Sequence, residues 1–292
     1  MSDTLYIPPI EQWLNDIRLY VREKAPEILS LLEIYIGEAK FGRNLIHNDL
    51  NNIGKNAKIL EVGAGSMILS CQLVKEGYDV TALEPMGSGY SHFNQMQALI
   101  LDLANHQNCS PQILHLPVEK LNVQNNFDFA FSINVMEHVE DVSLALTLIS
   151  NSLKEKAVYR FTCPNYLFPY EPHFNIPTLF SKSITEKFFK KLIFNKIKIP
   201  DPEGTWNSLN WINVHQIKKI VHSLSHFDLT FNKHYVVSIF ERILHDSEFC
   251  KRRSGWMIHI IKGITHLRLH YLFGFIPIIM QPTIDCKITR LE

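Results

Sequence analysis

The stretch from Lys58 to Glu84 constrains the fold of this chain more than any other part of the sequence. It opens on an apolar run, residues 59–62, of the length that a buried parallel strand uses. Gly63 and Gly65 follow this run, and because glycine has no Cβ, the backbone here can turn tightly and come close to a ligand. The sequence therefore predicts a strand that ends in a glycine turn.

The second half of the stretch is predicted to form a helix followed by a strand. Residues 66–76 carry apolar side chains near helical spacing, and Gly77 is placed to end the helix. Residues 78–83 are predicted as a second strand, which ends at Glu84. This acid follows the glycines by about twenty residues, where a carboxylate can accept hydrogen bonds from both hydroxyls of a ribose. The order indicates one nucleotide-binding half-unit of an α/β sheet.

The residues around the glycines disfavour a dinucleotide. Dinucleotide sites use G-x-G-x-x-G, so that the helix N-terminus can bind a pyrophosphate. Here the acid Glu61 precedes the first glycine, and Ile68 stands where the third glycine of that pattern would be. An acid at this place suits a ligand that carries an ammonium group.

The segment Glu61-Val-Gly63-Ala-Gly65-Ser-Met67 resembles motif I of the class I S-adenosylmethionine-dependent methyltransferases, commonly E-x-G-x-G-x-G. Met67 replaces the third glycine of this motif. The resemblance implies the cofactor S-adenosyl-L-methionine, bound in this part of the chain by Glu61, Gly63, Ala64, Gly65, Glu84 and Pro85.

Two later segments resemble further motifs of the family. Residues 117–121 are similar to the segment that meets the adenine ring, where the backbone of Val118 and the side chain of Glu119 are candidates. In residues 127–139 a strand is predicted to end at Asn134 and a helix to begin near Glu137. This order resembles motif IV of the small-molecule methyltransferases, F-D followed by E-H-V. It implies that Asn134 faces the methionine end of the cofactor or the substrate.

The remaining segments complete the predicted sheet. Residues 113–116, 157–162 and 227–231 are predicted as strands, and residues 213–225 as a helix. The segment 281–290 alternates apolar and polar side chains, which suits the antiparallel strand that closes this fold. We therefore expect an α/β fold, a doubly wound seven-stranded mostly parallel sheet of the Rossmann-like methyltransferase type.

The predicted domain organisation has a cap, one domain and two insertions. Residues 1–55 are expected to form a helical N-terminal cap, and residues 56–292 the methyltransferase domain. Insertions are expected at about 164–213, as a substrate cap, and at about 238–280. Arg43 in the leader either reaches a carboxylate at the cofactor mouth or is a solvated surface arginine.

The first insertion contains the candidate catalytic pair. It follows the carboxyl end of a strand, which in such a fold places it over the active site. His173 is predicted as the general base, because histidine titrates near working pH, with Glu171 orienting it or serving instead. Glu137 and His138 are expected to stabilise the turn and the helix start, with substrate contact as the alternative for His138. The candidates for substrate contact are His138, Tyr166, Tyr170, Trp206 and Trp211.

Two segments rich in lysine and arginine are either solvated or packed on the protein, or they contact a membrane surface. Residues 182–198 carry six lysines against Glu186, as a solvated helix face or as a contact to acidic head groups. Residues 250–280 combine cations with the apolar run 271–280, which suits a helical lid or an interfacial helix in a bilayer surface. The run is too short to span a bilayer. Peripheral membrane contact through 250–280 is thus one of two predictions.

The composition excludes several classes of function. The chain has 292 residues and a formal net charge of zero, which argues against a nucleic-acid partner. Its five cysteines form no C-x-x-C pair, so we expect neither disulfides nor a metal site. The same pattern fits a reducing compartment, and we therefore expect a cytoplasmic location. The N-terminus lacks the pattern of a signal peptide, and 18 consecutive apolar residues occur nowhere.

The resemblance implies that a methyl group is transferred to a hydroxyl or amine of a small-molecule, glycan or lipid-linked acceptor. An Asn-Pro-Pro-Tyr type element for a flipped base is absent after the fourth strand, because that strand ends Ser-Ile-Asn-Val-Met. Methylation of a protein or nucleic acid stays a further alternative, which the missing element disfavours, and two others stay open. The chain could bind S-adenosylmethionine without catalysis, or it could be an NAD(P)-dependent oxidoreductase, although it shows no Tyr-x-x-x-Lys proton relay.

Overall fold

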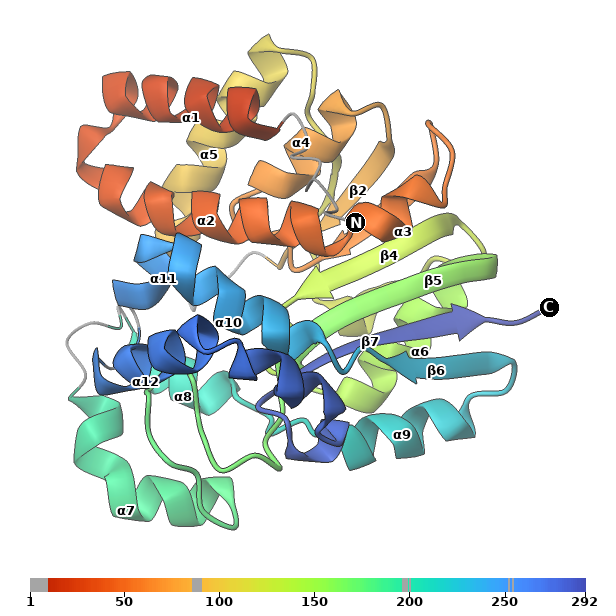
Figure 1. Cartoon of the computed structure of the whole chain (residues 1–292). Helices are drawn as coiled ribbons and strands as arrows, with labels where there is room; N and C mark the ends of the chain where they lie inside the picture. The colour runs from red at the N-terminus through yellow and green to blue at the C-terminus, as the bar shows by residue number, and fades with distance from the viewer. Residues whose placement is uncertain (1–9, 86–90, 196–198, 200, 252, 254) are drawn as a thin grey trace. The chain divides into compact units, whose positions relative to one another are not determined.

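A computed structural model describes residues 10–85, 91–195, 199, 201–251, 253 and 255–292 (Figure 1). The sequence also predicts a turn at Gly87 and Gly89, which lies outside these residues, as do Lys196 and Lys198. The strand order is β3-β2-β1-β4-β5-β7-β6, which confirms the predicted seven-stranded α/β sheet. By contacts the chain divides into two compact units, Met1–Leu116 with Asn126–Phe131, and Pro117–Asn125 with Ser132–Glu292.

The first unit contains the parallel part of the sheet. Its strands are β1 (Lys58–Val62), β2 (Asp79–Leu83), β3 (Gln112–Leu114) and most of β4 (Phe127–Ile133). β1 pairs in parallel with β2 and β4, and β2 with β3. The crossover helices are α4 (Ile68–Lys75) and α5 (Ser91–His106). The first two predicted strands are confirmed almost residue by residue.

The helical leader is also confirmed. It comprises α1 (Ile10–Lys24), the short 3-10 turn Pro26–Ile28, α2 (Leu29–Leu45) and α3 (His47–Asn51). Helix α1 buries Trp13, Leu14 and Ile17 on one face, because these residues recur at helical spacing. The indole Nε1 of Trp13 donates to the carbonyl of Ile68 at 3.0 Å, which ties the leader to the first turn of α4.

The second unit contains the antiparallel part of the sheet. Strand β7 (Thr283–Arg290) pairs antiparallel with both β5 (Leu153–Pro164) and β6 (Phe227–Phe231). Helices α6 (Val142–Ser152) and α9 (Val214–Ser223) belong to this unit. The antiparallel strand predicted for residues 281–290 is confirmed, and its apolar residues Ile284, Cys286 and Ile288 are fully buried.

The two predicted insertions are mostly helical. The first contains α7 (Lys182–Phe194) and α8 (Pro202–Ser208). The second contains α10 (Tyr235–His245), α11 (Ser247–Lys251), α12 (Gly255–His266) and the 3-10 turns Leu269–Phe275 and Ile278–Met280. Within the described part of the chain, no helix is both long and apolar enough to cross a membrane.

The helix predicted to begin near Glu137 begins five residues later. Residues 134–140 form an irregular turn, and α6 starts at Val142. The side chain of Asp141 accepts a hydrogen bond from the backbone N–H of Leu144 at 3.0 Å and so caps this helix. The prediction of the helix start was therefore wrong, and Glu137 lies in the loop between strand and helix.

The ion pair between Arg160 and Asp285 joins β5 to β7 and gives a test of this arrangement. Arg160 donates to both oxygens of Asp285, at 2.9 and 2.6 Å, and Asp285 is fully buried. We expect Asp285→Ala to lower the free energy of unfolding by about 3–5 kcal/mol, because it leaves a buried guanidinium without a counter-charge. The measurement is urea unfolding followed by circular dichroism.

The control for this prediction is Glu292→Ala, which removes the partner of Lys156. Both side chains of that pair are more than 70% exposed, so that the change should be below about 1 kcal/mol. Equal effects of the two substitutions would contradict the importance of the buried pair.

Candidate functional site

The glycine turn lies at the carboxyl end of β1. The backbone φ angles are 73° at Gly63 and 49° at Gly65, in the left-handed region that glycine adopts without strain. Met67 also has a positive φ, 66°, at the residue before α4. The family motif has glycine at this position, and the conformation supplies the reason: a side chain here is held in a backbone region that favours glycine.

Glu84 lies directly against this turn. Its Oε2 accepts a hydrogen bond from the backbone N–H of Gly65 at 2.8 Å, and the N–H of Gly63 donates to the carbonyl of Leu83 at 2.8 Å. Burial raises the pKa of Glu84, while the bond from Gly65 acts to lower it. The structure thus brings together the predicted cofactor residues of the first unit, with buried Ala64 inside the turn and exposed Pro85 next to Glu84.

Glu61 is a buried carboxylate without a cationic partner among the described residues. Its exposed fraction is 7%, and its hydrogen-bond donor is the hydroxyl of Ser70. Burial raises the pKa of Glu61 to about 8, and the charge of Glu84 acts in the same direction. A ligand with an ammonium group would supply the missing positive charge, as the sequence predicts for this position.

The predicted adenine segment belongs to the second unit. Val118 is buried at the start of the 3-10 turn Val118–Lys120. The Oε1 atom of Glu119 accepts from the backbone N–H groups of Glu140 and Asp141, at 2.8 and 3.2 Å. The side chain of Glu119 therefore stabilises the loop that precedes α6.

The loop after β4 is held by residues of the first insertion. Asn134 is exposed and has a positive φ of 54°. The Nδ2 atom of Asn210 donates to the carbonyls of Met136 and Val139, at 2.7 and 2.9 Å. His138 Nδ1 lies 2.8 Å from the hydroxyl of Ser208. No pattern in the sequence indicates such a role for Asn210 or Ser208, because both contacts cross about 70 residues of chain.

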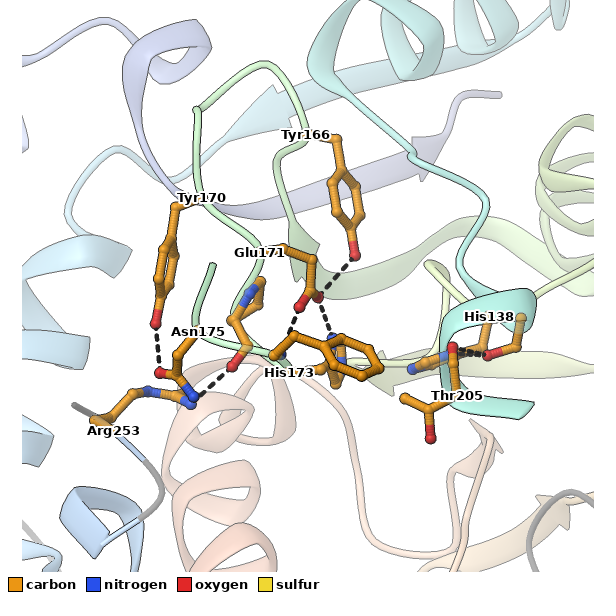
Figure 2. Close-up of polar contacts among 11 residues, drawn as sticks. His138, Tyr166, Tyr170, Glu171, His173, Asn175, Thr205 and Arg253 are labelled. Atoms are coloured by element: carbon orange, nitrogen blue, oxygen red, sulfur yellow. Dashed lines mark hydrogen bonds and ion pairs between the residues drawn. The ribbon is translucent and has the colours of Figure 1, made fainter. Parts of the chain in front are cut away.

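Glu171 and His173 form a tight pair, which is drawn in Figure 2. Glu171 Oε1 lies 2.6 Å from Nδ1 of His173, and Oε2 accepts from the backbone N–H of Phe174 at 2.6 Å. The hydroxyl of Tyr166 donates to Oε1 at 3.3 Å. The carboxylate is fully buried, whereas 27% of the imidazole is exposed. The arrangement orients the ring so that Nε2 is the nitrogen available for chemistry.

Glu171 and His173 shift the pKa of each other in opposite directions. Burial acts to raise the pKa of Glu171, but the charge and the hydrogen bond of His173 outweigh it and lower the pKa. Burial acts to lower the pKa of His173, but Glu171 outweighs it and raises the pKa. By contrast, burial lowers the pKa of His138 to about 3, helped by the charge of His173. The two histidines, with ring centroids 5.2 Å apart, thus differ in basicity.

The aromatic residues predicted to contact substrate differ in accessibility. Trp206 is fully buried and donates from Nε1 to Glu186 at 2.9 Å. The ring of Tyr166, which is 8% exposed, stacks on Trp211 with centroids 5.1 Å apart, and this contact holds the ring whose hydroxyl donates to Glu171. Tyr170 is bonded through its hydroxyl to Asn175 at 2.7 Å (Figure 2).

Glu137, His138 and His173 form a cluster that could hold a metal ion. Its carboxylate is fully buried, and neither oxygen has a hydrogen-bond partner among the described residues. Burial raises its pKa to about 7, against the charge of His173. Potential ligand atoms of Glu137, His138 and His173 lie within 4.8 Å of one another. The sequence led us to expect no metal site, whereas the structure brings together three side chains of the right chemistry.

The comparison with protein families decides the class of this chain. Residues 39–224, more than half of the sequence, match the model of a methyltransferase domain. The chain belongs to this methyltransferase family. The resemblance to the class I S-adenosylmethionine-dependent methyltransferases is thereby confirmed.

Two curated relatives differ in how much of the chain they match, and the second is named a methyltransferase. This methyltransferase is 41% identical over 281 residues to the uncharacterized protein Rv1509 of Mycobacterium tuberculosis, covering 96% of this chain and 95% of that protein. It is 24% identical over 207 residues to a ubiquinone biosynthesis O-methyltransferase of Rickettsia prowazekii, covering 62% and 78% of the two chains.

A solved structure shows the likeness of the fold. The phosphoethanolamine N-methyltransferase 2 of Haemonchus contortus, in complex with S-adenosyl-L-methionine, has a TM-score of 0.52 at 12% sequence identity. The alignment covers 94% of this chain and 60% of that one. At this identity the likeness concerns the fold alone.

The buried Glu61 predicts a pH-dependent affinity for S-adenosylhomocysteine, which carries an ammonium group. Because the pKa of Glu61 is about 8, the carboxyl is mainly protonated at neutral pH and must ionise to pair with that group. We expect the dissociation constant to fall about tenfold per pH unit as the pH rises towards about 8, with release of one proton. Calorimetric titration in two buffers of different ionisation enthalpy measures both the dissociation constant and the number of protons released.

Glu61→Gln is the matched variant, since it keeps the shape of the side chain. It should bind more weakly and lose the pH dependence below about 8. If the dissociation constant changes with pH equally in this variant and in the wild type, the pH dependence belongs to another group.

Proposed function

We propose that this methyltransferase transfers the methyl group of S-adenosylmethionine to a hydroxyl or amine of a small-molecule, glycan or lipid-linked acceptor. The observation that carries the proposal is the buried Glu171–His173 pair, in which a carboxylate orients an imidazole 27% exposed to solvent. Such a pair has the chemistry of a general base, which an acceptor hydroxyl or ammonium needs.

The residues of the glycine turn fit the cofactor. S-adenosylmethionine supplies, when bound, an activated methyl carbon on a sulfonium that is a good leaving group. Glu61 is the candidate partner of its ammonium group, and Glu84 of its ribose hydroxyls. Gly63, Ala64, Gly65 and Pro85 provide the backbone around it, and Val118, Glu119 and Asn134 are proposed as further contacts.

His173 is proposed to accept the proton of the acceptor. Nε2 of His173 would take the proton of the acceptor hydroxyl or amine. This frees the lone pair of that oxygen or nitrogen to receive the methyl group, while the bond from methyl to sulfur breaks and S-adenosylhomocysteine leaves. Nδ1 remains bonded to Glu171, which stabilises the imidazolium that results. The protein otherwise positions the reactants and excludes water, so that most of the acceleration comes from orientation.

Two kinds of observation support an apolar or lipid-linked acceptor. The relatives include enzymes named for ubiquinone biosynthesis, whose acceptors carry an apolar chain. In addition, large apolar side chains are exposed in the second insertion, among them Leu267, Leu272 and Phe275 at 67%, 60% and 78%. No acidic residue occurs between Gly255 and Met280, which suits contact with an anionic membrane surface.

The test is the methyl-transfer rate of His173→Ala. With a panel of phenolic, sugar and primary-amine acceptors that includes phosphoethanolamine, we expect kcat about 10²- to 10⁴-fold below wild type. The wild-type rate should rise with pH through the raised pKa of His173, because only the neutral imidazole accepts a proton. Release of S-adenosylhomocysteine is the readout, and the exposed His222→Ala is the control.

Addition of a chelator separates this role from metal catalysis. If His173 acts as a base, the rate in EDTA equals the rate without it. Loss of the rate in EDTA, with recovery on adding a divalent cation, would instead assign His173 with Glu137 and His138 to a metal. Binding of the cofactor with no transfer to any acceptor would favour the non-catalytic alternative.

A further inference from the structure

Helix α7 of the first insertion exposes a row of large apolar side chains. The row begins just before the helix and has a spacing of four residues: Phe180 is 98% exposed, Ile184 39%, Phe188 72% and Leu192 58%. Positions four apart lie on one face of a helix. Because α7 is kinked at Phe189, the exposed fractions rather than ideal helical geometry define this face. We call these four side chains the apolar row of α7.

The other side of α7 is held by the rest of the first insertion. Nζ of Lys182 donates to the carbonyls of Asn207 and Leu209, at 3.0 and 2.7 Å. Glu186 accepts from Nε1 of the fully buried Trp206 at 2.9 Å. These contacts fix the helix on the protein, and the apolar row is exposed although the opposite side is packed.

The exposed charges of α7 are all positive. Within Lys182–Phe194 the charged residues other than Lys182 and Glu186 are three lysines, Lys187, Lys190 and Lys191, and all three are exposed. With the neighbouring α8 included, residues 182–203 hold six lysines against three acids. A lysine can lay its aliphatic stem along apolar groups while its ammonium group reaches a polar layer.

This combination matches an anionic bilayer surface. Interfacial helices bind with phenylalanine and leucine in the acyl boundary and with lysines among the lipid phosphates. A second copy of the chain on the same row would instead bring two groups of three lysines into one contact, where like charges repel. For the lysines of 182–198 the sequence allowed a solvated face or a contact to acidic head groups, and the apolar row beside them favours the second.

We propose that the apolar row of α7 binds the surface of an anionic membrane, with Lys187, Lys190 and Lys191 at the level of the lipid phosphates. The helix has 13 residues, a length of about 20 Å, so it lies in the surface and does not span it. The row uses residues other than those of 250–280. The inference does not rest on the proposed function, because binding to lipid needs no methyl acceptor.

The experiment sediments the full-length protein with vesicles of two compositions, phosphatidylcholine alone and phosphatidylcholine mixed with phosphatidylglycerol. We expect binding to the mixed vesicles that weakens as the salt concentration rises, and at least about tenfold weaker binding to the neutral vesicles. Equal binding to both compositions, or no binding to the mixed vesicles, would overturn the proposal.

A pair of leucine variants locates the contact. Leu192→Ser should weaken binding to the mixed vesicles about tenfold, because less apolar surface enters the bilayer. Leu19→Ser on α1 is the matched control, since Leu19 is 61% exposed, and its affinity should equal that of the wild type. Leu272→Ser separates α7 from the second insertion: if it weakens binding while Leu192→Ser does not, the contact belongs to residues 250–280 and the proposal fails.

Two double variants test the charges. Lys190→Gln with Lys191→Gln should weaken binding to the mixed vesicles at least about tenfold and leave binding to neutral vesicles unchanged. Lys218→Gln with Lys219→Gln on α9 removes two equally adjacent, exposed lysines and should change neither. Equal affinities of the two double variants would contradict the role of the α7 lysines. Far-ultraviolet circular dichroism identical to that of the wild type shows that each variant is folded.

Discussion

The hydrogen bond from Gly65 to Glu84 is the contact on which the proposed cofactor chemistry depends. β1 and β2 pair in parallel with Val62 opposite Leu83, so the residues that follow the two strands meet at one edge of the sheet. The N–H of Gly65 then reaches the carboxylate of Glu84 at 2.8 Å. On the far side of the turn, Gln97 donates to the carbonyl of Gly65 at 3.0 Å. The turn is therefore held before any ligand binds.

The second unit shows how one kind of side chain is put to different uses by its surroundings. Glu171 and Glu137 are both fully buried. Glu171 is compensated by His173 and by two further donors, and its pKa is lowered despite its burial. Glu137 has no such donors in the described part of the chain, and burial raises its pKa to about 7. Carboxyl groups whose pKa values are driven apart in this way are typical of sites that move protons or bind cations.

Features governed by local rules could be predicted from the sequence. The glycine turn, the position of Glu84 and the alternation of β7 follow from glycine chemistry, from parallel pairing and from the period of a strand. The start of α6 was missed although its sign was present, because Asp141 before an apolar run is a good N-cap. The contacts of Asn210 and the pairing of Arg43 with Glu76 join residues more than 30 positions apart, so that no pattern along the chain announces them.

The most direct test of the central claim is the affinity of the purified protein for S-adenosylhomocysteine, measured by calorimetry beside Glu84→Ala, with NADH as the competing nucleotide. We expect micromolar binding of S-adenosylhomocysteine, at least about tenfold weaker in Glu84→Ala because the ribose loses its acceptor, and no binding of NADH. Binding of NADH instead, or an affinity for S-adenosylhomocysteine that Glu84→Ala leaves unchanged, would contradict it.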